Sequence, residues 1–346
     1  MTPKDYDYNL PKELVAQKPA EPRDSARLMI YDTKTGSVSF DVFRNIGKYL
    51  PTPALLVFND TRVLPARMFA LDSEGVQREI LVLVNEVVSE YSFLALVRGK
   101  TQIGDVFTLT GERFEVIKVE EKVVTLNTSL SKVELEKFLE KYGTTPLPPY
   151  IKDHQMKEDE LRLRYQTVFS ANGRAAAAPT ASLHFTEEVL ESLHKKGLEK
   201  TFVTLNVGLG TFAPITEENV KEKKLHKEYL EVFSSSSEKI RSAKESSIPV
   251  VAVGTTVVRT LESASEEILS GKESLKETDL FIQPGFDFKV VDHLITNFHV
   301  PKSSLLMLVD AFLAHKKAKR GILELYEEAK KEKMRFFSFG DSMLIL

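Results

Sequence analysis

The 346-residue sequence contains no cysteine and no tryptophan. Without cysteine the chain can form no disulfide, thiolate nucleophile, cysteine-ligated zinc site or iron–sulfur cluster. It also lacks any run of about 18 apolar residues and any apolar signal region near Met1, so we expect a cytoplasmic protein that does not enter a membrane. The 47 Lys and Arg residues are balanced by 50 Asp and Glu residues, which excludes a globally basic nucleic-acid binder.

What is present is typical of a globular protein, with 42% hydrophobic and 28% charged residues. The length favours two domains, because single cores rarely grow beyond roughly 250–300 residues. From about Arg67 to Tyr142 the chain is rich in short, alternating, β-branched runs separated by polar or glycine turns. These runs are Glu79–Val88, Tyr91–Val97, Asp105–Thr110, Arg113–Val119 and Val123–Asn127. Five strands at this spacing predict a small barrel or sandwich.

Strands and helices alternate in the rest of the chain. The expected strands are Leu28–Tyr31, Leu55–Phe58, Thr201–Val207, Pro249–Val253, Asp279–Gln283, His293–Phe298 and Ser342–Leu346. The expected helices are Ser131–Tyr142, one capped by Thr186, one from Gly254 to Gly271, one from Ser303 to about His315, and Leu323–Lys333. We therefore predict a mixed α/β main domain, residues 1–66 and 146–346, with residues 67–145 forming an inserted small β-barrel domain.

Two glycine-containing turns follow predicted strands, where open α/β sheets bind ligands. In Gly254-Thr255-Thr256 a strand runs into a helix N-terminus, whose free N–H groups and hydroxyls suit a carboxylate, phosphate or ribose; an ordinary turn is the alternative. In the stretch 205–212, Gly208, Gly210 and Thr211 look like a nucleotide-binding turn. However, a third glycine is missing and Pro214 follows instead of a helix, so a dinucleotide-binding or standard methyltransferase fingerprint is not indicated.

Charged residues cluster after the strand that ends near Phe58. Asp60, Arg62 and Arg67 lie within eight positions, and guanidinium groups suit bidentate binding of a carboxylate or phosphate. A surface ion pair without function is the alternative. Further basic clusters are residues 194–196, 221–227, 315–320 and 330–335, which we interpret as solvated faces of helices unless two or more converge into a phosphate-binding track.

Three of the seven histidines, His184, His226 and His299, lie near hydroxyl or carboxylate residues. Each could accept a proton near neutral pH, although a lone histidine is more often structural. No HExxH or similar ligand spacing occurs, so no metal site is expected.

Several motifs in colinear order resemble the S-adenosylmethionine:tRNA ribosyltransferase-isomerase family of the queuosine pathway. They are residues 6–11, 22–28, 59–67, 178–186, 207–212, 254–262, 279–288, 294–306 and 339–341, so the resemblance runs from residue 6 to residue 346. This sequence departs from the family pattern at Ser182, Asn206, Val257 and His293, where the family more often has Gly, His, Ser and Gly. Asn206 matters most, because a neutral amide cannot carry a proton as imidazole does.

The resemblance implies an enzyme that moves the ribosyl part of S-adenosylmethionine onto 7-aminomethyl-7-deazaguanine at the wobble position of a tRNA. The product is epoxyqueuosine, with adenine and methionine released. It implies an α/β domain with an inserted barrel, no metal or redox cofactor, and S-adenosylmethionine as a consumed substrate. The expected partner is the anticodon loop of the tRNA, and we expect a monomer.

The chemistry requires a base that removes a sugar proton made acidic by the sulfonium. The candidates are His184, His226 and His299, with Asp60, Glu228 or Asp341 as acid, base or orienting partner. Substrate binding is expected from Arg62, Arg67, Thr180, Gly208, Gly210, Thr211, Gly254, Thr255, Thr256, Arg259, Asn297 and Lys302. Two alternatives remain at this point: a methyltransferase acting on RNA, and a non-catalytic RNA-binding module.

Overall fold

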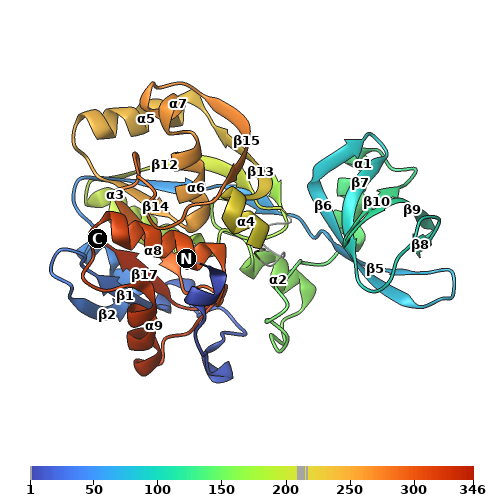
Figure 1. The fold of residues 1–346 in the computed structure, drawn as a ribbon, viewed down its shortest axis with the longest axis horizontal. Coiled ribbons are helices and arrows are strands. Elements are labelled where there is room, and N and C mark those ends of the chain that lie inside the picture. Colours follow the sequence, from blue (N-terminus) through green and yellow to red (C-terminus); the bar gives the residue numbers. More distant parts are fainter. Residues whose placement is uncertain (1, 209–214, 216) are drawn as a thin grey trace.

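The main domain is built on one twisted nine-stranded sheet (Figure 1). The structure is a computed structural model that describes residues 2–208, 215 and 217–346. In spatial order the strands are β15 (Ser274–Leu280), β13 (Lys224–Val232), β12 (Leu198–Asn206), β3 (Ala54–Asn59), β14 (Val250–Val253), β16 (His293–Asn297), β17 (Ser342–Ile345), β1 (Arg27–Tyr31) and β2 (Val38–Val42). The four central strands, β12, β3, β14 and β16, are parallel to one another.

Helices cover both faces of this sheet, because the central strands are apolar on both sides. Leu55 and Val57 of β3 join one core with the apolar faces of α5 (Ser234–Glu245), α6 (Thr255–Ser263), α7 (Ser265–Leu269), α8 (Ser304–His315) and α9 (Ile322–Lys331). Leu56 and Phe58 join the opposite core with α3 (Glu187–Lys195). Two buried faces explain why these strands are continuous apolar runs instead of alternating ones.

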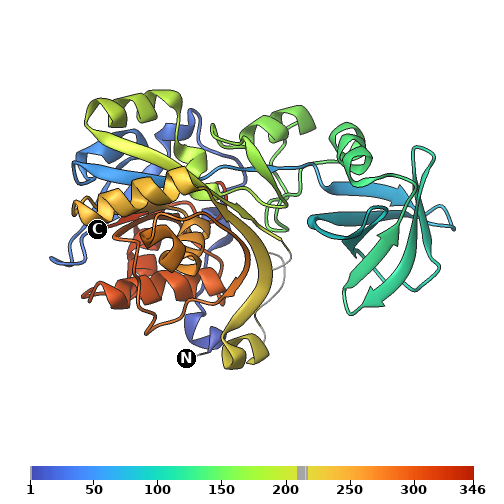
Figure 2. The same ribbon diagram turned by 90° about the horizontal axis from the view of Figure 1, so that it is seen from above.

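The inserted unit is a closed six-stranded barrel that stands to one side of the main domain (Figure 2). Its strands are β5 (Arg67–Leu71), β6 (Gln77–Ser89), β7 (Ser92–Val97), β8 (Val106–Leu109), β9 (Glu112–Glu120) and β10 (Val123–Asn127). Phe93, Phe114 and Val116 fill the interior, and Leu135 and Leu139 of α1 (Lys132–Tyr142) pack against it. The chain returns to the main domain through α2 (Glu158–Arg164) and β11 (Asn172–Ala175), which pairs with β4 (Thr61–Val63).

The predicted class, a mixed α/β domain with an inserted small β-barrel, is confirmed, and the exact domain boundaries stay a prediction. Three local expectations are wrong. The strand expected at Asp279–Gln283 is β15, Ser274–Leu280; Phe281 and Ile282 are apolar because they pack into the core as a loop. The helix expected up to Gly271 breaks at Ala264, whose backbone leaves the helical region at φ −108° and ψ 21°.

The third error concerns two basic clusters interpreted as helix faces. Of residues 221–227 only the first belong to a helix, α4 (Glu217–Glu222), and β13 begins at Lys224 after a turn with Lys223 at φ 56°. Of residues 315–320 only His315 belongs to a helix, α8. The sixth barrel strand, β5, and the helix α5 were not predicted. Within the described part of the chain, we find no helix with the length and hydropathy needed to span a membrane.

Replacing the buried ring of Phe114 by Ala should lower the free energy of unfolding of the barrel by about 3–5 kcal/mol, since it removes a fully buried ring from a closed core. The matched control is Ile117→Ala on the same strand, where the side chain is 44% exposed and the expected loss is below about 1 kcal/mol. Urea unfolding followed by circular dichroism measures both. Equal losses would contradict the assignment of the barrel core.

Candidate active site

The carboxyl ends of the four parallel strands meet at one edge of the main sheet. The segments that leave this edge are Val207-Gly208 after β12, Asp60-Thr61 after β3, Gly254 to Thr256 after β14, and Phe298-His299 after β16. Open α/β sheets bind ligands at this edge, because the turns there converge and helix N-termini point towards it.

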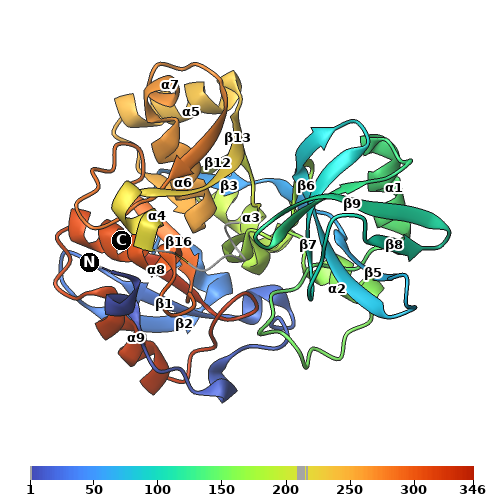
Figure 3. The same cartoon turned by 45° about the vertical axis from the view of Figure 1, so that its right-hand side comes forward.

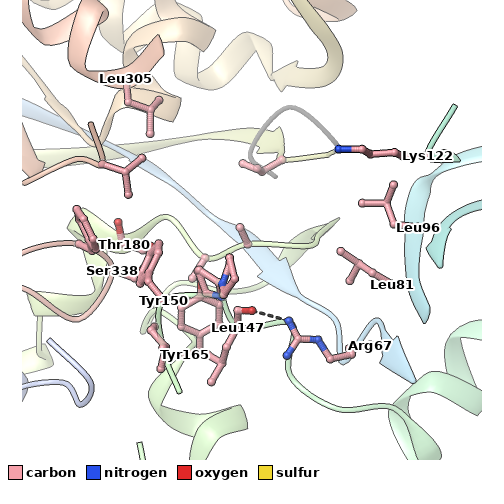
Figure 4. Close-up of a pocket in the computed structure, with 18 of the residues that line it drawn as sticks. Arg67, Leu81, Leu96, Lys122, Leu147, Tyr150, Tyr165, Thr180, Leu305 and Ser338 are labelled. Carbon is pink, nitrogen blue, oxygen red and sulfur yellow. Dashed lines mark hydrogen bonds between the residues drawn. The ribbon is translucent and has the colours of Figure 1, made fainter. Parts of the chain in front are cut away.

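A cavity of about 1710 Å³ lies between this edge and the barrel (Figure 4). Leu81 of β6 and Leu96 of β7 belong to its barrel wall, and Figure 3 shows β6 and β7 on the side of the barrel that faces the main domain. The main-domain wall contains Thr180, Ser338 and Leu305. Of the residues predicted to form the site, the cavity is lined by Arg67, Thr180, Glu228, Gly254, Thr255, Thr256, Arg259, Asn297 and His299.

The turn from β14 into α6 depends on a glycine. Gly254 has φ 102°, a backbone conformation that residues with a Cβ adopt only under strain, and its N–H donates to Ile295 O on the neighbouring strand at 2.8 Å. The first N–H groups of α6 have no acceptor within the helix. Their partial positive charge therefore faces the cavity edge lined by Thr255 and Thr256.

A buried ion pair lies beside this helix start. Arg259, on the second turn of α6, donates from Nη1 to Oε2 of Glu228 on β13, and the two residues are 7% and 5% exposed. Glu228 Oε1 accepts a hydrogen bond from Gly208 N–H at 3.3 Å, and Arg259 Nε donates to Leu280 O at 3.3 Å. The pair thus joins β12, β13, α6 and the end of β15 at the cavity wall.

His299 is the one of the three candidate histidines that lines the cavity. Its Nε2 lies 3.2 Å from Thr296 Oγ1, and its backbone N–H donates to the Tyr326 hydroxyl at 2.7 Å. Burial lowers the pKa of His299 to about 4, so the imidazole is neutral at pH 7. A neutral imidazole can accept a proton.

Asn297 lies next to it at the end of β16. Its amide Nδ2 is 3.4 Å from Nε2 of His184, while its Oδ1 is buried and has no hydrogen-bond partner among the described residues.

Two predicted acids, Asp60 and Asp341, are hydrogen-bonded to other residues of the protein. Asp60 accepts from the Thr204 hydroxyl at 2.6 Å and from Asn172 Nδ2 at 2.8 Å. Asp341 accepts from the backbone N–H of Arg27 at 3.0 Å and of Arg335 at 2.8 Å, and it pairs with the Arg335 guanidinium. Neither carboxylate lines the cavity.

Two predicted bases also lie outside the cavity lining. His184 is buried against the Phe43 ring, with ring centroids 5.0 Å apart, and burial lowers its pKa to about 4. His226 is exposed on β13.

Three predicted binding residues make surface or inter-element contacts instead. Arg62 pairs with Glu140 of α1 at 2.7 Å, and Lys302 pairs with Asp7 at 2.9 Å. Arg67 does line the cavity, but its guanidinium pairs with Glu79 and donates to Leu147 O (Figure 4). Gly208 sits beside Glu228, as described above, whereas Gly210 and Thr211 lie outside the described residues.

Asn206, the main departure from the family pattern, is tied into the backbone at this edge. Its Oδ1 accepts from the Thr61 hydroxyl at 2.9 Å and from Arg174 N–H at 2.8 Å. An amide oxygen that accepts two bonds holds β12, β4 and β11 together without moving a proton.

Sequence reasoning missed three members of the aromatic wall of the cavity, Tyr150, Tyr165 and Phe337. Tyr150, Tyr165, Phe298 and Phe337 line it, and the hydroxyls of Tyr150 and Ser338 share a 2.7 Å hydrogen bond. The Tyr150 and Phe337 rings are 4.7 Å apart between centroids. Tyr150 directly follows the Pro-rich segment 145–149, and in the sequence that proline pattern indicates a linker and not part of a site.

The described residues contain no group of three or more His, Asp or Glu side chains placed to hold a metal ion. On the sheet-edge side of the cavity, the polar side chains are the Arg259 guanidinium, the Glu228 carboxylate, threonine hydroxyls, the Asn297 amide and the neutral His299 imidazole. These groups suit recognition of an organic ligand by hydrogen bonds and charge.

A mixed sheet whose parallel central strands carry a ligand-sized cavity at their carboxyl edge, with a barrel on the far side of that cavity, is typical of a ligand-binding α/β protein. The sequence model of a family described as "Queuosine biosynthesis protein" matches residues 3–345. The curated S-adenosylmethionine:tRNA ribosyltransferase-isomerase of Carboxydothermus hydrogenoformans is 44% identical over 347 residues, 99% of each chain. Its counterpart of the same name in Clostridioides difficile is 43% identical over 353 residues, 100% of each chain.

A solved structure agrees with these matches. The S-adenosylmethionine tRNA ribosyltransferase of Thermotoga maritima has a TM-score of 0.55 and 34% identity, covering 99% of this chain and 100% of that one. The chain therefore belongs to the family of queuosine biosynthesis proteins and is an enzyme of that family. The resemblance drawn from its motifs is confirmed.

The buried His184 makes stability depend on pH. Its pKa is about 4 in the folded protein and about 6.5 in the unfolded chain, so below pH 6.5 the unfolded state binds the extra proton. The free energy of unfolding should therefore fall as the pH drops from 6.5 to 4, by up to about 1.4 kcal/mol per pH unit for this group.

We expect His184→Gln to reduce that slope by the share of this one group, because burial also lowers the pKa of His293 and of His299 to about 4 and their linkage remains. The exposed-site control His226→Gln should leave the slope unchanged. Urea unfolding at pH 7, 6 and 5 measures the slopes. The same slope in His184→Gln as in the unsubstituted protein would show that His184 does not carry this proton linkage.

Proposed function

We propose that the chain transfers and isomerises the ribosyl part of S-adenosylmethionine onto 7-aminomethyl-7-deazaguanine at the wobble position of a tRNA. The product is epoxyqueuosine-tRNA, and adenine and methionine are released. The observation that carries this proposal, beside the family membership, is the cavity between the sheet edge and the barrel, which combines a neutral imidazole, an ion pair and aromatic side chains.

The size of the cavity suits two reactants. Pockets for a single small ligand are typically about 300–1,000 Å³, and this one is about 1710 Å³. The aromatic wall around Tyr150 and Phe337 supports binding of a base that has left its stack, since aromatic rings stack on any base. In the proposed reaction S-adenosylmethionine is consumed, with no metal or redox cofactor.

The barrel wall supports the proposed contact with the tRNA anticodon loop. Lys100 and Lys122 are exposed on this wall of the cavity, where they can contact phosphates. Arg98 is exposed there too but pairs with Glu79 at 3.3 Å, and Asp105 and Glu121 line the same wall. The sheet-edge part of the main-domain wall is instead buried, and its Glu228–Arg259 pair is neutral as a whole. The cytoplasmic, monomeric state expected from the sequence is part of this proposal.

In the proposed mechanism His299 is the general base. The sulfonium acidifies the C–H bonds of the adjacent sugar carbon, and neutral His299 removes one of these protons. Adenine then leaves, the aminomethyl nitrogen of the deazaguanine attacks the sugar, and closure of the epoxide expels methionine. Glu228 is the one carboxylate among the proposed acids that lines the cavity, where it holds Arg259.

The central test is product analysis. The protein is incubated with S-adenosylmethionine and a tRNA that carries 7-aminomethyl-7-deazaguanine, and we expect one adenine per modified nucleoside together with the mass of epoxyqueuosine. A methyl-transferring enzyme would release S-adenosylhomocysteine and no adenine. Tight tRNA binding without any turnover would instead indicate an RNA-binding module, and either result would overturn the proposal.

The base is tested by substituting each histidine. His299→Gln should lower the single-turnover rate of adenine release by about 10²–10⁴-fold, the usual contribution of a general base. His184→Gln and His226→Gln, whose rings lie outside the cavity lining, should each lose less than about tenfold. A near-normal rate in His299→Gln, with retained binding of S-adenosylmethionine, would remove His299 from the mechanism.

A further inference from the structure

The buried Glu228–Arg259 pair has unused bonding capacity on the cavity side. Arg259 donates from Nη1 to Glu228 and from Nε to Leu280 O, but its Nη2 is buried and has no hydrogen-bond partner among residues 2–208, 215 and 217–346. The hydroxyl of Thr256, one turn earlier on α6, is also buried and unpartnered within the same described part of the chain. Arg259 and Thr256 both line the cavity.

Donors left unpaired at a cavity wall lower the stability of the protein unless a ligand supplies the acceptor. A buried polar group without a partner costs about 1–3 kcal/mol, and more for a charged group, so folded proteins satisfy nearly all of them. Burying an ion pair also removes water from both charged groups, and the attraction between the two charges rarely offsets that cost in free energy. Three kinds of donor therefore lack an acceptor at one cavity wall: the Arg259 guanidinium, the Thr256 hydroxyl and the start of α6. This combination indicates a ligand that supplies the acceptor.

We propose that this pair binds the α-amino-acid head group of S-adenosylmethionine. The carboxylate of the ligand accepts from Arg259 Nη2, from the Thr256 hydroxyl and from the first N–H groups of α6. The ammonium group of the ligand donates to Glu228, whose carboxylate has lone pairs left after binding Arg259 and Gly208 N–H. This assignment rests on the proposed function, since it names the part of that substrate bound at the sheet edge.

The charge of the pair favours this head group over a tRNA phosphate. Arg259 and Glu228 together are neutral and buried, and a zwitterion matches the two opposite charges one to one. A phosphate bound to Arg259 would bring its negative charge next to Glu228, and nothing there would compensate it. The exposed Lys100 and Lys122 on the barrel wall can contact phosphates at a much smaller desolvation cost.

The ligand itself provides the first test, which uses the unsubstituted protein. Calorimetric titration compares S-adenosylmethionine with its decarboxylated form, which keeps the adenosine, the sulfonium and the amine. A site with buried donors for the carboxylate should bind the decarboxylated compound at least about tenfold more weakly, because those donors stay unpaired. Equal affinity for the two compounds would overturn the proposal.

The second test links this selectivity to the pair. Arg259→Lys keeps the positive charge but lacks the second N–H edge, so it should weaken S-adenosylmethionine at least tenfold and leave the decarboxylated form within about threefold of its original affinity. The matched control is Arg320→Lys, which alters another Arg–Glu pair, between Arg320 just before α9 and Glu328 in the second half of α9, at 3.1 Å. It should change neither affinity. Thermal unfolding checks that each variant is folded.

The remaining outcomes separate this inference from the proposed function. If Arg259→Lys weakens both compounds equally, the pair only supports the fold and the inference is wrong. If it leaves S-adenosylmethionine unchanged but flattens the salt dependence of tRNA binding, Arg259 contacts phosphate and the inference is also wrong. Adenine release by the unsubstituted protein in either case shows that the proposed function stands. Carboxylate-selective binding without adenine release would instead uphold the head-group site and refute the proposed reaction.

Discussion

The parallel alignment of β12, β3, β14 and β16 is the constraint on which the rest of the site depends. Parallel strands place all their carboxyl ends at one edge, so segments that are far apart in the sequence leave the sheet side by side. Gly254, after β14, and His299, after β16, meet there for this reason. The antiparallel β13 then runs back beside β12 and delivers Glu228 to Arg259.

The two walls of the cavity differ in their physical character. The sheet-edge wall is buried, its one ion pair is neutral as a whole, and its imidazole carries no charge at pH 7. The barrel wall carries exposed cations such as Lys100 and Lys122. A desolvated wall strengthens each specific hydrogen bond to a small ligand, whereas a solvated basic wall suits a polyanion that must also leave.

The candidate site could be predicted in outline but not in its assignments. The turn Gly254-Thr255-Thr256 follows from local sequence, and the family resemblance over residues 254–262 predicts Arg259 as a binding residue. In contrast, the sequence does not distinguish the carboxylates of Asp60 and Asp341 from that of Glu228. Only the contacts of Asp60 with Thr204 and of Asp341 with Arg335 show that these two side chains stabilise the fold and do not line the cavity. His184, His226 and His299 could not be ranked either, because burial and direction relative to the cavity are properties of the assembled protein.

The sequence by itself determined the classes of structure: alternating apolar runs specify barrel strands, continuous ones specify strands buried on both faces, and a glycine before Thr255 specifies where α6 begins. These signals are local, because each reports which side of one segment is buried. Tertiary structure alone decided the order of the strands. That order brought Glu228 beside Arg259, 31 positions further along the chain, and it placed the polar segment Ser274–Leu280 at one edge of the sheet. Such contacts depend on which segments become neighbours in the folded protein.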